Sequence, residues 1–259
     1  MTIAVCVKQI PGPDAEPAFD PRTGTFARDE GLVMDESDIY GVELALRLAE
    51  LTADGEVLAI SMAPDQAEEG LRSAFAMGVP RAVLVSDPAL AGTDALGTAK
   101  VLAAVVSRAD ASLVVAATES TDGYTGTVPV QMAELLGYPA LTFVRSVEIE
   151  DDIITVQRQT EEGYDLVSCP LPAVVTVTAG VVEPRYPTLK ALMAARTKPI
   201  EILTLSDLGI ASHEVGAVGA RQQVVSIEQL LSRRAGEVIT DFGVAHERII
   251  EALKAWGAI

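Results

Sequence analysis

The chain has 259 residues, of which 49% are hydrophobic and 22% are charged, so it can bury the sizeable core of one large domain. Its formal net charge of −18 argues against a nucleic acid as the main partner, because phosphate binding needs a basic surface. The longest apolar stretch, residues 171–182, is interrupted by Pro172 and Gly180 and is shorter than the roughly twenty residues of a membrane-spanning helix.

The first two thirds of the sequence alternate short apolar runs with amphipathic segments. The apolar runs predict strands at residues 3–7, 55–62, 82–86 and 112–117. The segments between them predict helices at residues 37–51, 64–77 and 93–107. Pro64 in a first helical turn and Gly78 just beyond a last turn are expected helix ends. Because the strands are apolar without alternation, they predict a doubly wound, mostly parallel sheet covered by helices on both faces.

A loop of small residues follows the strand at 112–117. It runs through Gly123 and Gly126 into a helix predicted to begin after Thr127, with Pro129 in its first turn and Gly137 at its end. The free N–H groups at a helix start favour a phosphate, and ligands of parallel sheets bind at the carboxyl ends of the strands. Many α/β turns of this composition bind no ligand, so the pattern alone leaves both interpretations open.

The residues around this loop do not predict catalysis. Glu119 and Asp122 could form an acid/base pair, but no nucleophile, histidine or metal-ligand cluster accompanies them, and a carboxylate near a helix start is commonly a cap. Cys6 and Cys169 lie far apart without a C-x-x-C motif, which predicts reduced core thiols. We therefore expect no catalytic side chain and no metal.

After Pro139 the pattern changes to consecutive strands, with turns at 150–152 and 161–163 that predict antiparallel hairpins. The predicted strands are residues 140–149, 153–159, 164–168, 173–178 and 200–203. Beyond Gly209 the pattern weakens, and helices are predicted only at residues 227–234 and 245–256. The sequence thus predicts an α/β nucleotide-binding domain over residues 1–208 and a C-terminal arm over residues 209–259.

Residues 183–195 read E-P-R-Y-P-T-L-K-A-L-M-A-A. Two prolines stiffen this segment, and Leu189, Leu192 and Met193 follow at the i, i+3, i+4 spacing of one helical face. Four basic residues surround them, opposed only by Glu183: Arg185, Lys190, Arg196 and Lys198. The pattern has two interpretations: a docking loop for partner proteins over residues 183–199, or an ordinary proline-rich turn with its leucines in the core.

The segment closely resembles the recognition loop of electron transfer flavoprotein beta subunits, E-P-R-x-x-x-L-x-x-I-M-x-A followed by basic residues. The resemblance covers residues 1 to about 210 and implies that Leu189 is the anchor inserted into partner dehydrogenases, with Arg185, Leu192 and Met193 beside it. After Met193 many relatives have a run of lysines, whereas this chain has A-A-R-T-K.

The glycine-containing loop is similar to the AMP-binding loop of the same family, D-G-D-T-A-Q-V-G-P in one branch. It departs at Tyr124, Gly126, Thr127 and Pro129, so the resemblance is stronger for backbone contacts than for side-chain contacts. By position, the residues that it implies at the nucleotide are Cys6, Asp35, Met62, Ala117, Asp122, Gly123, Tyr124, Thr125, Gly126, Thr127 and Val128. Lys8 matches the family's V-K-x-[IV] start; the alternative is a surface lysine bonded to strand-end carbonyls.

The resemblance implies the beta subunit of a heterodimeric electron carrier. It would bind AMP, help enclose an FAD held mainly by the alpha subunit, and dock acyl-CoA or related dehydrogenases of fatty acid β-oxidation, with residues 209–259 packing on the alpha subunit. Where relatives commonly have E-R-E, this chain has Q-R-Q at residues 157–159. The ion pair that the second glutamate makes with the alpha subunit would therefore become a hydrogen bond from Gln159. No targeting segment precedes the apolar run at residues 3–7, so we expect a cytoplasmic protein without membrane insertion.

Two other classes remain as alternatives. An ATP-using enzyme of this architecture would need an S-G-G-x-D-S-like loop after the first strand, where this chain has residues 8–11, K-Q-I-P. A nucleotide-binding stress-type module acting as a homodimer would leave the docking loop and the arm unexplained. Relatives that hold a second flavin typically keep the full D-G-D-T-A-Q-V-G-P pattern, so the departures here predict AMP.

Overall fold

The computed structural model describes residues 1–12, 19, 28, 31–52, 54–228, 238–240 and 243–259. The chain divides into two compact units, Met1–Val225 and Ser226–Ile259. Gly216 and Arg221 belong to the first unit, where their N–H groups donate to Thr93 Oγ1 at 2.9 Å and to Asp94 Oδ2 at 2.6 Å.

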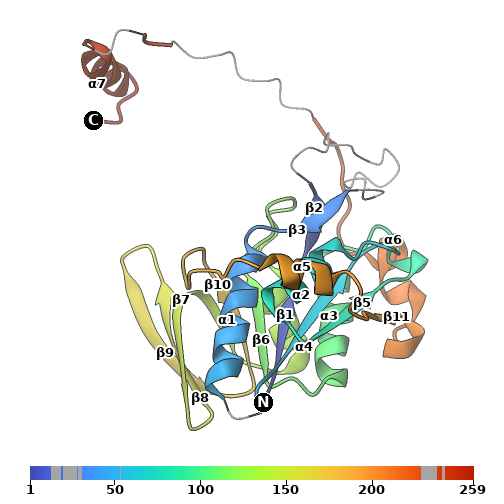
Figure 1. Ribbon diagram of the computed structural model, residues 1–259. Coiled ribbons are helices and arrows are strands. Elements are labelled where there is room, and N and C mark those ends of the chain that lie inside the picture. Colours follow the sequence, from blue (N-terminus) through green and yellow to red (C-terminus); the bar gives the residue numbers. More distant parts are fainter. Residues whose placement is uncertain (13–18, 20–27, 29–30, 53, 229–237, 241–242) are drawn as a thin grey trace. The chain divides into compact units, whose positions relative to one another are not determined.

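One large sheet organises the first unit, with the order β11-β5-β4-β1-β6-β10-β7-β8-β9 among the described strands (Figure 1). The strands are β1 Thr2–Cys6, β4 Glu56–Met62, β5 Arg81–Val85, β6 Leu113–Ala117, β7 Ala140–Glu150, β8 Ile153–Gln159, β9 Tyr164–Pro170, β10 Ala173–Val177 and β11 Glu201–Leu203. Pairing is parallel from β11 to β7 and antiparallel from β7 to β9. The predicted doubly wound, mostly parallel sheet with an antiparallel extension is confirmed.

Helices cover both faces of this sheet. They are α1 Asp38–Leu51, α2 Glu69–Met77, α3 Ala95–Arg108 and α4 Val128–Leu136. Two shorter helices lie elsewhere: α5 Leu189–Ala195 packs against α2, and α6 Gly216–Gly219 contacts residues 88–90 and 212–214. Successive residues of a strand point to opposite faces, so Ile3 packs in a cluster with α1 and α2, whereas Ala4 packs in a second cluster with α3 and α4. The strand residues are buried on both sides, which explains why their sequences are apolar without alternation.

The path of the chain creates a switch point between β1 and β6. From β1 the chain moves outward through β4 to β5, and after α3 it returns to β6 on the other side of β1. In open parallel sheets, ligands bind in the crevice at the carboxyl ends of the strands at such a point. The carboxyl ends of β1 and β6 are Cys6 and Ala117, two of the residues that the sequence analysis singled out.

The prediction for α2 was wrong at its start, because the helix begins at Glu69 and not at Pro64. The buried side chain of Gln9 supplies the cap: its Oε1 accepts from Gly70 N at 3.0 Å and its Nε2 donates to Ala67 O at 2.5 Å. Gln9 belongs to a two-stranded antiparallel ribbon, β2 (Gln9–Pro11) and β3 (Leu32–Met34), which the sequence did not predict.

The second unit contains α7 (Ala245–Ala255), which matches the helix predicted at residues 245–256. The helix predicted at residues 227–234 falls mostly outside the described residues, and Ile227 and Glu228, which are described, are not helical. Within the described part of the chain, no helix has the length and apolar character that a membrane crossing requires.

Candidate functional site

A buried carboxylate lies at the switch point. Asp38, the first residue of α1, accepts a hydrogen bond from Lys8 N at 2.5 Å and another from the N–H of Ala117, so it bridges the ends of β1 and β6. Burial raises the pKa of Asp38 to about 8, and the two N–H groups only partly offset this. Burial and the nearby Asp38 raise the pKa of Cys6 to about 12, so its thiol stays protonated. Asp38 was not among the predicted site residues; its place as an acidic residue in a first helical turn was the available signal.

A second buried carboxylate, Asp35, fixes the loop that follows β6. Its Oδ1 accepts from Ser37 N at 2.9 Å and from Ser37 Oγ at 2.5 Å. Its Oδ2 accepts from Thr121 N at 2.7 Å and from Thr121 Oγ1 at 2.9 Å. Both carboxylate oxygens are thus engaged within the protein, which makes Asp35 a support of the loop over residues 118–127.

Asp122 lies in this loop between two basic side chains. Arg28 forms a hydrogen-bonded ion pair with it, and Lys8 Nζ lies 3.8 Å from its Oδ1. Burial pushes the pKa of Asp122 upward, but the charges of Lys8 and Arg28 outweigh burial and hold it below its ordinary value. Asp122 is therefore ionised, and the two basic side chains offset its negative charge.

The loop ends at the N-terminus of α4. Gly126 has a φ of +63°, a left-handed conformation that turns the chain into the helix and that glycine adopts without strain. Thr127 occupies the N-cap position as expected, but its side chain makes no capping hydrogen bond. The first N–H groups of a helix have no partner within the helix, so together with the Thr127 hydroxyl they form a set of donors at this end.

The structure brings the residues predicted for the nucleotide to one edge of the sheet. Cys6, Met62 and Ala117 end the neighbouring strands β1, β4 and β6, and residues 122–128 form the loop just beyond β6. Within the described residues, two buried side-chain oxygens lack a hydrogen-bond partner: Asp122 Oδ1 in this loop and Gln131 Oε1 in α4. Unsatisfied acceptors beside a helix N-terminus fit a ligand that carries hydroxyl or amino groups as well as a phosphate.

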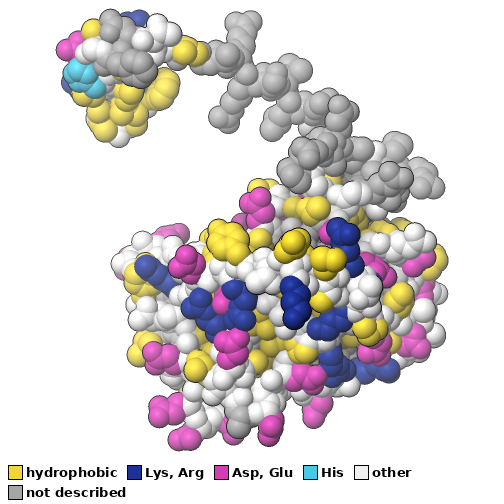
Figure 2. Space-filling view, in the orientation of Figure 1, with side chains coloured by type: hydrophobic (Ala, Val, Ile, Leu, Met, Phe, Trp, Pro, Cys, Tyr) yellow, Lys and Arg dark blue, Asp and Glu magenta, His cyan; other side chains and the backbone are white. Residues whose placement is uncertain are grey.

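Three of the four predicted docking residues, Leu189, Leu192 and Met193, lie on another element, α5, which packs against α2. Thr188 begins this helix, because its Oγ1 accepts from Ala191 N at 3.2 Å. The exposed fractions are 75% for Leu189, 47% for Leu192 and 66% for Met193. The interpretation of an ordinary turn with its leucines in the core is therefore wrong, and Figure 2 shows hydrophobic side chains over α5 with basic side chains near them.

Two of the four basic residues around this tip are held by the protein itself. Arg185 forms ion pairs with Glu43 at 2.7 Å and with Glu50 at 2.9 Å, both on α1. Lys198 donates to Val79 O at 2.7 Å, and its ammonium group lies 4.7 Å from the centre of the Phe75 ring. Lys190 and Arg196 are exposed, so the positive charge offered to a partner is smaller than the sequence suggested.

Comparison with known proteins decides the family. A model of the electron transfer flavoprotein domain matches residues 23–208. The chain is 37% identical over 259 residues to the electron transfer flavoprotein subunit beta of Mycobacterium tuberculosis (strain ATCC 25618 / H37Rv), which covers 98% of this chain and 97% of that protein. The chain belongs to the electron transfer flavoprotein beta subunits.

Other members of the family show how widely the likeness extends. The electron transfer flavoprotein subunit beta of Thermoanaerobacterium thermosaccharolyticum is 37% identical and covers 98% of each chain. The Caffeyl-CoA reductase-Etf complex subunit CarD of Acetobacterium woodii is 35% identical over 243 residues, 93% of this chain and 92% of that protein. The resemblance stated from the sequence is thus confirmed over nearly the whole chain, and it assigns this electron transfer flavoprotein subunit a role in electron transfer.

Metal chemistry has no candidate site in this flavoprotein subunit as far as the structure describes it. No group of three or more His, Cys, Asp or Glu side chains converges there in a way that could hold a metal ion.

Gln159, the residue expected to contact the alpha subunit, lies exposed at the end of β8, and the preceding Arg158 pairs with Asp165 of β9 at 3.9 Å.

Proposed function

We propose that this chain is the beta subunit of a heterodimeric electron transfer flavoprotein that binds AMP, helps an alpha subunit enclose FAD, and accepts electrons from acyl-CoA and related dehydrogenases. The observation that carries the proposal is the exposed apolar tip of α5 on a chain of this family. Monomeric proteins rarely expose several large apolar side chains on one short helix unless a partner covers them. The flavin supplies the electron chemistry, and the chain contributes binding and partner selection.

The loop beyond β6 is the proposed AMP site. The N-terminus of α4, the backbone of residues 123–128 and the Thr127 hydroxyl would hold the phosphate, because helix N-termini stabilise anions. Lys8 and Arg28 support this by neutralising Asp122. Asp35 contributes indirectly, since its carboxylate keeps the loop in place.

The same site favours AMP over a second FAD. Tyr124, Thr127 and Pro129 stand where the full family pattern has aspartate, glutamine and glycine. Pro129 lies in the first turn of α4, where it removes one N–H donor and fixes the backbone. The remaining donors suit one phosphate group better than a diphosphate.

The C-terminal arm, predicted over residues 209–259, is the proposed contact with the alpha subunit, and its residues 226–259 form the second unit. Helix α7 exposes the large apolar side chains of Ile249 at 53% and Ile250 at 43%, and Trp256, directly after the helix, is 78% exposed. Isolated helices of this length are marginal in water, so a helix with such exposed side chains needs a partner surface to be stable. A subunit whose C-terminal helix needs its partner's surface to be stable would be incomplete alone.

Reduction of the assembled complex tests the proposal. The chain is co-expressed with an electron transfer flavoprotein alpha subunit, and the absorbance of bound FAD is followed after addition of an acyl-CoA dehydrogenase and its acyl-CoA substrate. We expect the flavin to be reduced at a rate that depends on the dehydrogenase concentration. An FAD-containing complex that such dehydrogenases fail to reduce would refute the docking role, and formation of ADP from added ATP would support the enzyme alternative.

A further inference from the structure

We propose that Glu43 and Arg72 are positioning residues that hold the docking loop, residues 183–199, in the orientation that partner proteins bind. Glu43 lies on α1 and holds the start of the loop, whereas Arg72 lies on α2 and holds its end. This inference rests on the proposed docking function, because it concerns how Leu189 is presented to a partner.

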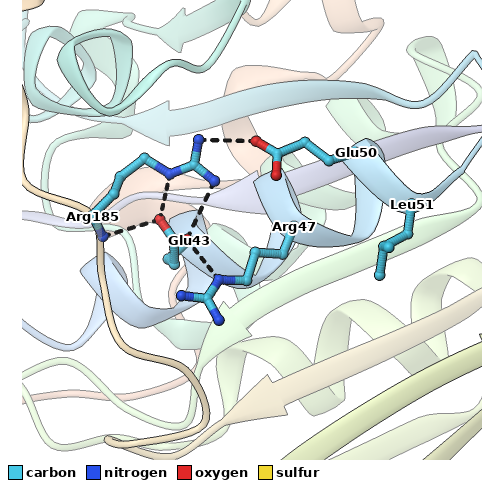
Figure 3. Close-up of a pocket in the computed structure, with 5 residues that line it drawn as sticks. All are labelled: Glu43, Arg47, Glu50, Leu51 and Arg185. Atoms are coloured by element: carbon cyan, nitrogen blue, oxygen red, sulfur yellow. Dashed lines mark hydrogen bonds and ion pairs between the residues drawn. The ribbon is translucent and has the colours of Figure 1, made fainter.

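The start of the loop is fastened by the carboxylate of Glu43, whose side chain is only 2% exposed. Its Oε2 accepts from Arg185 Nε at 2.7 Å and from Arg185 N at 3.2 Å, and its Oε1 accepts from Arg185 Nη2 at 3.2 Å. Figure 3 shows the guanidinium group of Arg185 lying between Glu43 and Glu50. Because two nitrogens of the Arg185 guanidinium group donate to the two carboxylate oxygens of Glu43, this contact fixes both the position and the plane of the guanidinium group.

Arg47 completes this attachment from the same helix. Its Nε donates to Glu43 Oε1 at 2.8 Å, and its Nη2 donates to the carbonyl oxygen of Glu183 at 2.7 Å. Helix α1 thus holds the backbone on both sides of Pro184. Burial pushes the pKa of Glu43 upward, but hydrogen bonds from Arg185 and Arg47 outweigh burial and keep the carboxyl ionised.

The end of the loop is fastened by Arg72. Its Nη1 donates to Ala195 O at 3.0 Å and also to the carbonyl oxygen of Lys198, so it binds the carbonyl group of the last residue of α5 and one carbonyl group beyond the helix. Positive charge at a helix C-terminus is favourable because those carbonyl groups have no partner within the helix. An ion pair with Glu68, the N-cap residue of α2, orients the Arg72 guanidinium group.

These two attachments explain how a short helix keeps an exposed apolar face. Helix α5 has seven residues, and of these only Ala195 is buried, so the helix gains little from packing of its own. An isolated helix of this length would not be stable. Ordering the loop before a partner arrives lowers the cost of binding, which is the usual benefit of preorganisation.

The test compares matched variants of the two-subunit complex. Glu43→Gln removes the negative charge of the buried carboxylate. Arg185→Lys keeps the positive charge but removes the planar guanidinium group that binds both carboxylate oxygens. Glu50→Gln is the control, because Glu50 contacts the same arginine from a side chain that is 60% exposed, where an ion pair contributes little. Arg72→Lys makes the corresponding change at the other end of the loop.

Two measurements distinguish positioning from general stability. Hydrogen exchange of the amides of residues 189–195 should be about tenfold faster or more in Glu43→Gln, Arg185→Lys and Arg72→Lys, with the rest of the sheet unchanged. The KM for an acyl-CoA dehydrogenase should rise by about tenfold while kcat at saturation stays the same, since only the ordering of the loop is lost. Glu50→Gln should change neither by more than about twofold.

The outcomes separate this inference from the proposed function. If Leu189→Ala raises KM but the Glu43 and Arg72 variants leave amide exchange or KM as in the wild type, the positioning role is refuted and docking stands. If Leu189→Ala leaves KM unchanged, the docking function itself fails, and the inference falls with it.

Discussion

Substitution of Leu189 by alanine should weaken the encounter with partner dehydrogenases without affecting the flavin. Full burial of a leucine side chain contributes about 2 kcal/mol, and 75% of Leu189 is available for burial by a partner. The expected loss is therefore about 1.5 kcal/mol, or about tenfold in affinity. The effect should be larger if the leucine enters a closed pocket, because hot-spot residues also exclude water from their neighbours.

The assay is the initial rate of flavin reduction in the two-subunit complex as a function of acyl-CoA dehydrogenase concentration. The variant should need about tenfold more dehydrogenase for half-maximal rate, with unchanged FAD content. Leu51→Ala is the matched control, since Leu51 is 85% exposed at the end of α1 and lies outside the docking loop. Equal rates of the Leu189 variant and the wild type at low dehydrogenase concentration would refute the anchor assignment.

Three further predictions follow from the switch point and the subunit contact. Asp35→Ala should lower the free energy of unfolding by about 3 kcal/mol and weaken AMP binding, because Ser37 and Thr121 lose their acceptor; unchanged denaturant midpoints would contradict this. Between pH 3.8, the ordinary pKa of an aspartate, and about pH 8, Asp38 is protonated in the folded state but ionised in the unfolded state. The free energy of unfolding therefore falls as the pH rises through this window. The melting temperature of Asp38→Asn minus that of the wild type should therefore increase from the low to the high pH end of this window. A difference that stays constant with pH would show that Asp38 does not titrate there. The chain expressed without an alpha subunit should be colourless, which an absorbance spectrum of the purified protein checks against a yellow, stoichiometric FAD complex.

The parallel core was predictable because its signal is local. The strand ending at Ala117 is apolar throughout and the strand ending at Met62 is mostly apolar, and the helices between them have the expected period. Gly78 and Gly137 end their helices in left-handed conformations, as the sequence indicated. Each of these features depends on residues within one element.

The start of α2 was not predictable, because its cap comes from elsewhere in the chain. Gln9 is 61 residues before Gly70, and its side chain replaces the local cap that Pro64 suggested. The position of β10 between β6 and β7 likewise depends on long-range parallel pairing, which a run of apolar residues does not encode.

The orientation and attachment of the docking loop could likewise not be predicted from the sequence. An apolar i, i+3, i+4 pattern is the same for a buried helix and for an exposed one, so only the structure shows that Leu189 and Met193 face outward. Arg185 appeared in the sequence as free positive charge, yet its partner Glu43 lies 142 residues away. The resemblance identified the loop, whereas its attachment to α1 and α2 required coordinates.

The ligand content of the purified two-subunit complex tests the central claim most directly. The complex is denatured, and the released nucleotides are separated by chromatography and quantified against the protein. A helix N-terminus suited to one phosphate, beside Asp122 whose charge Lys8 and Arg28 offset, predicts one FAD and one AMP per heterodimer. Two FAD molecules and no AMP would contradict the account.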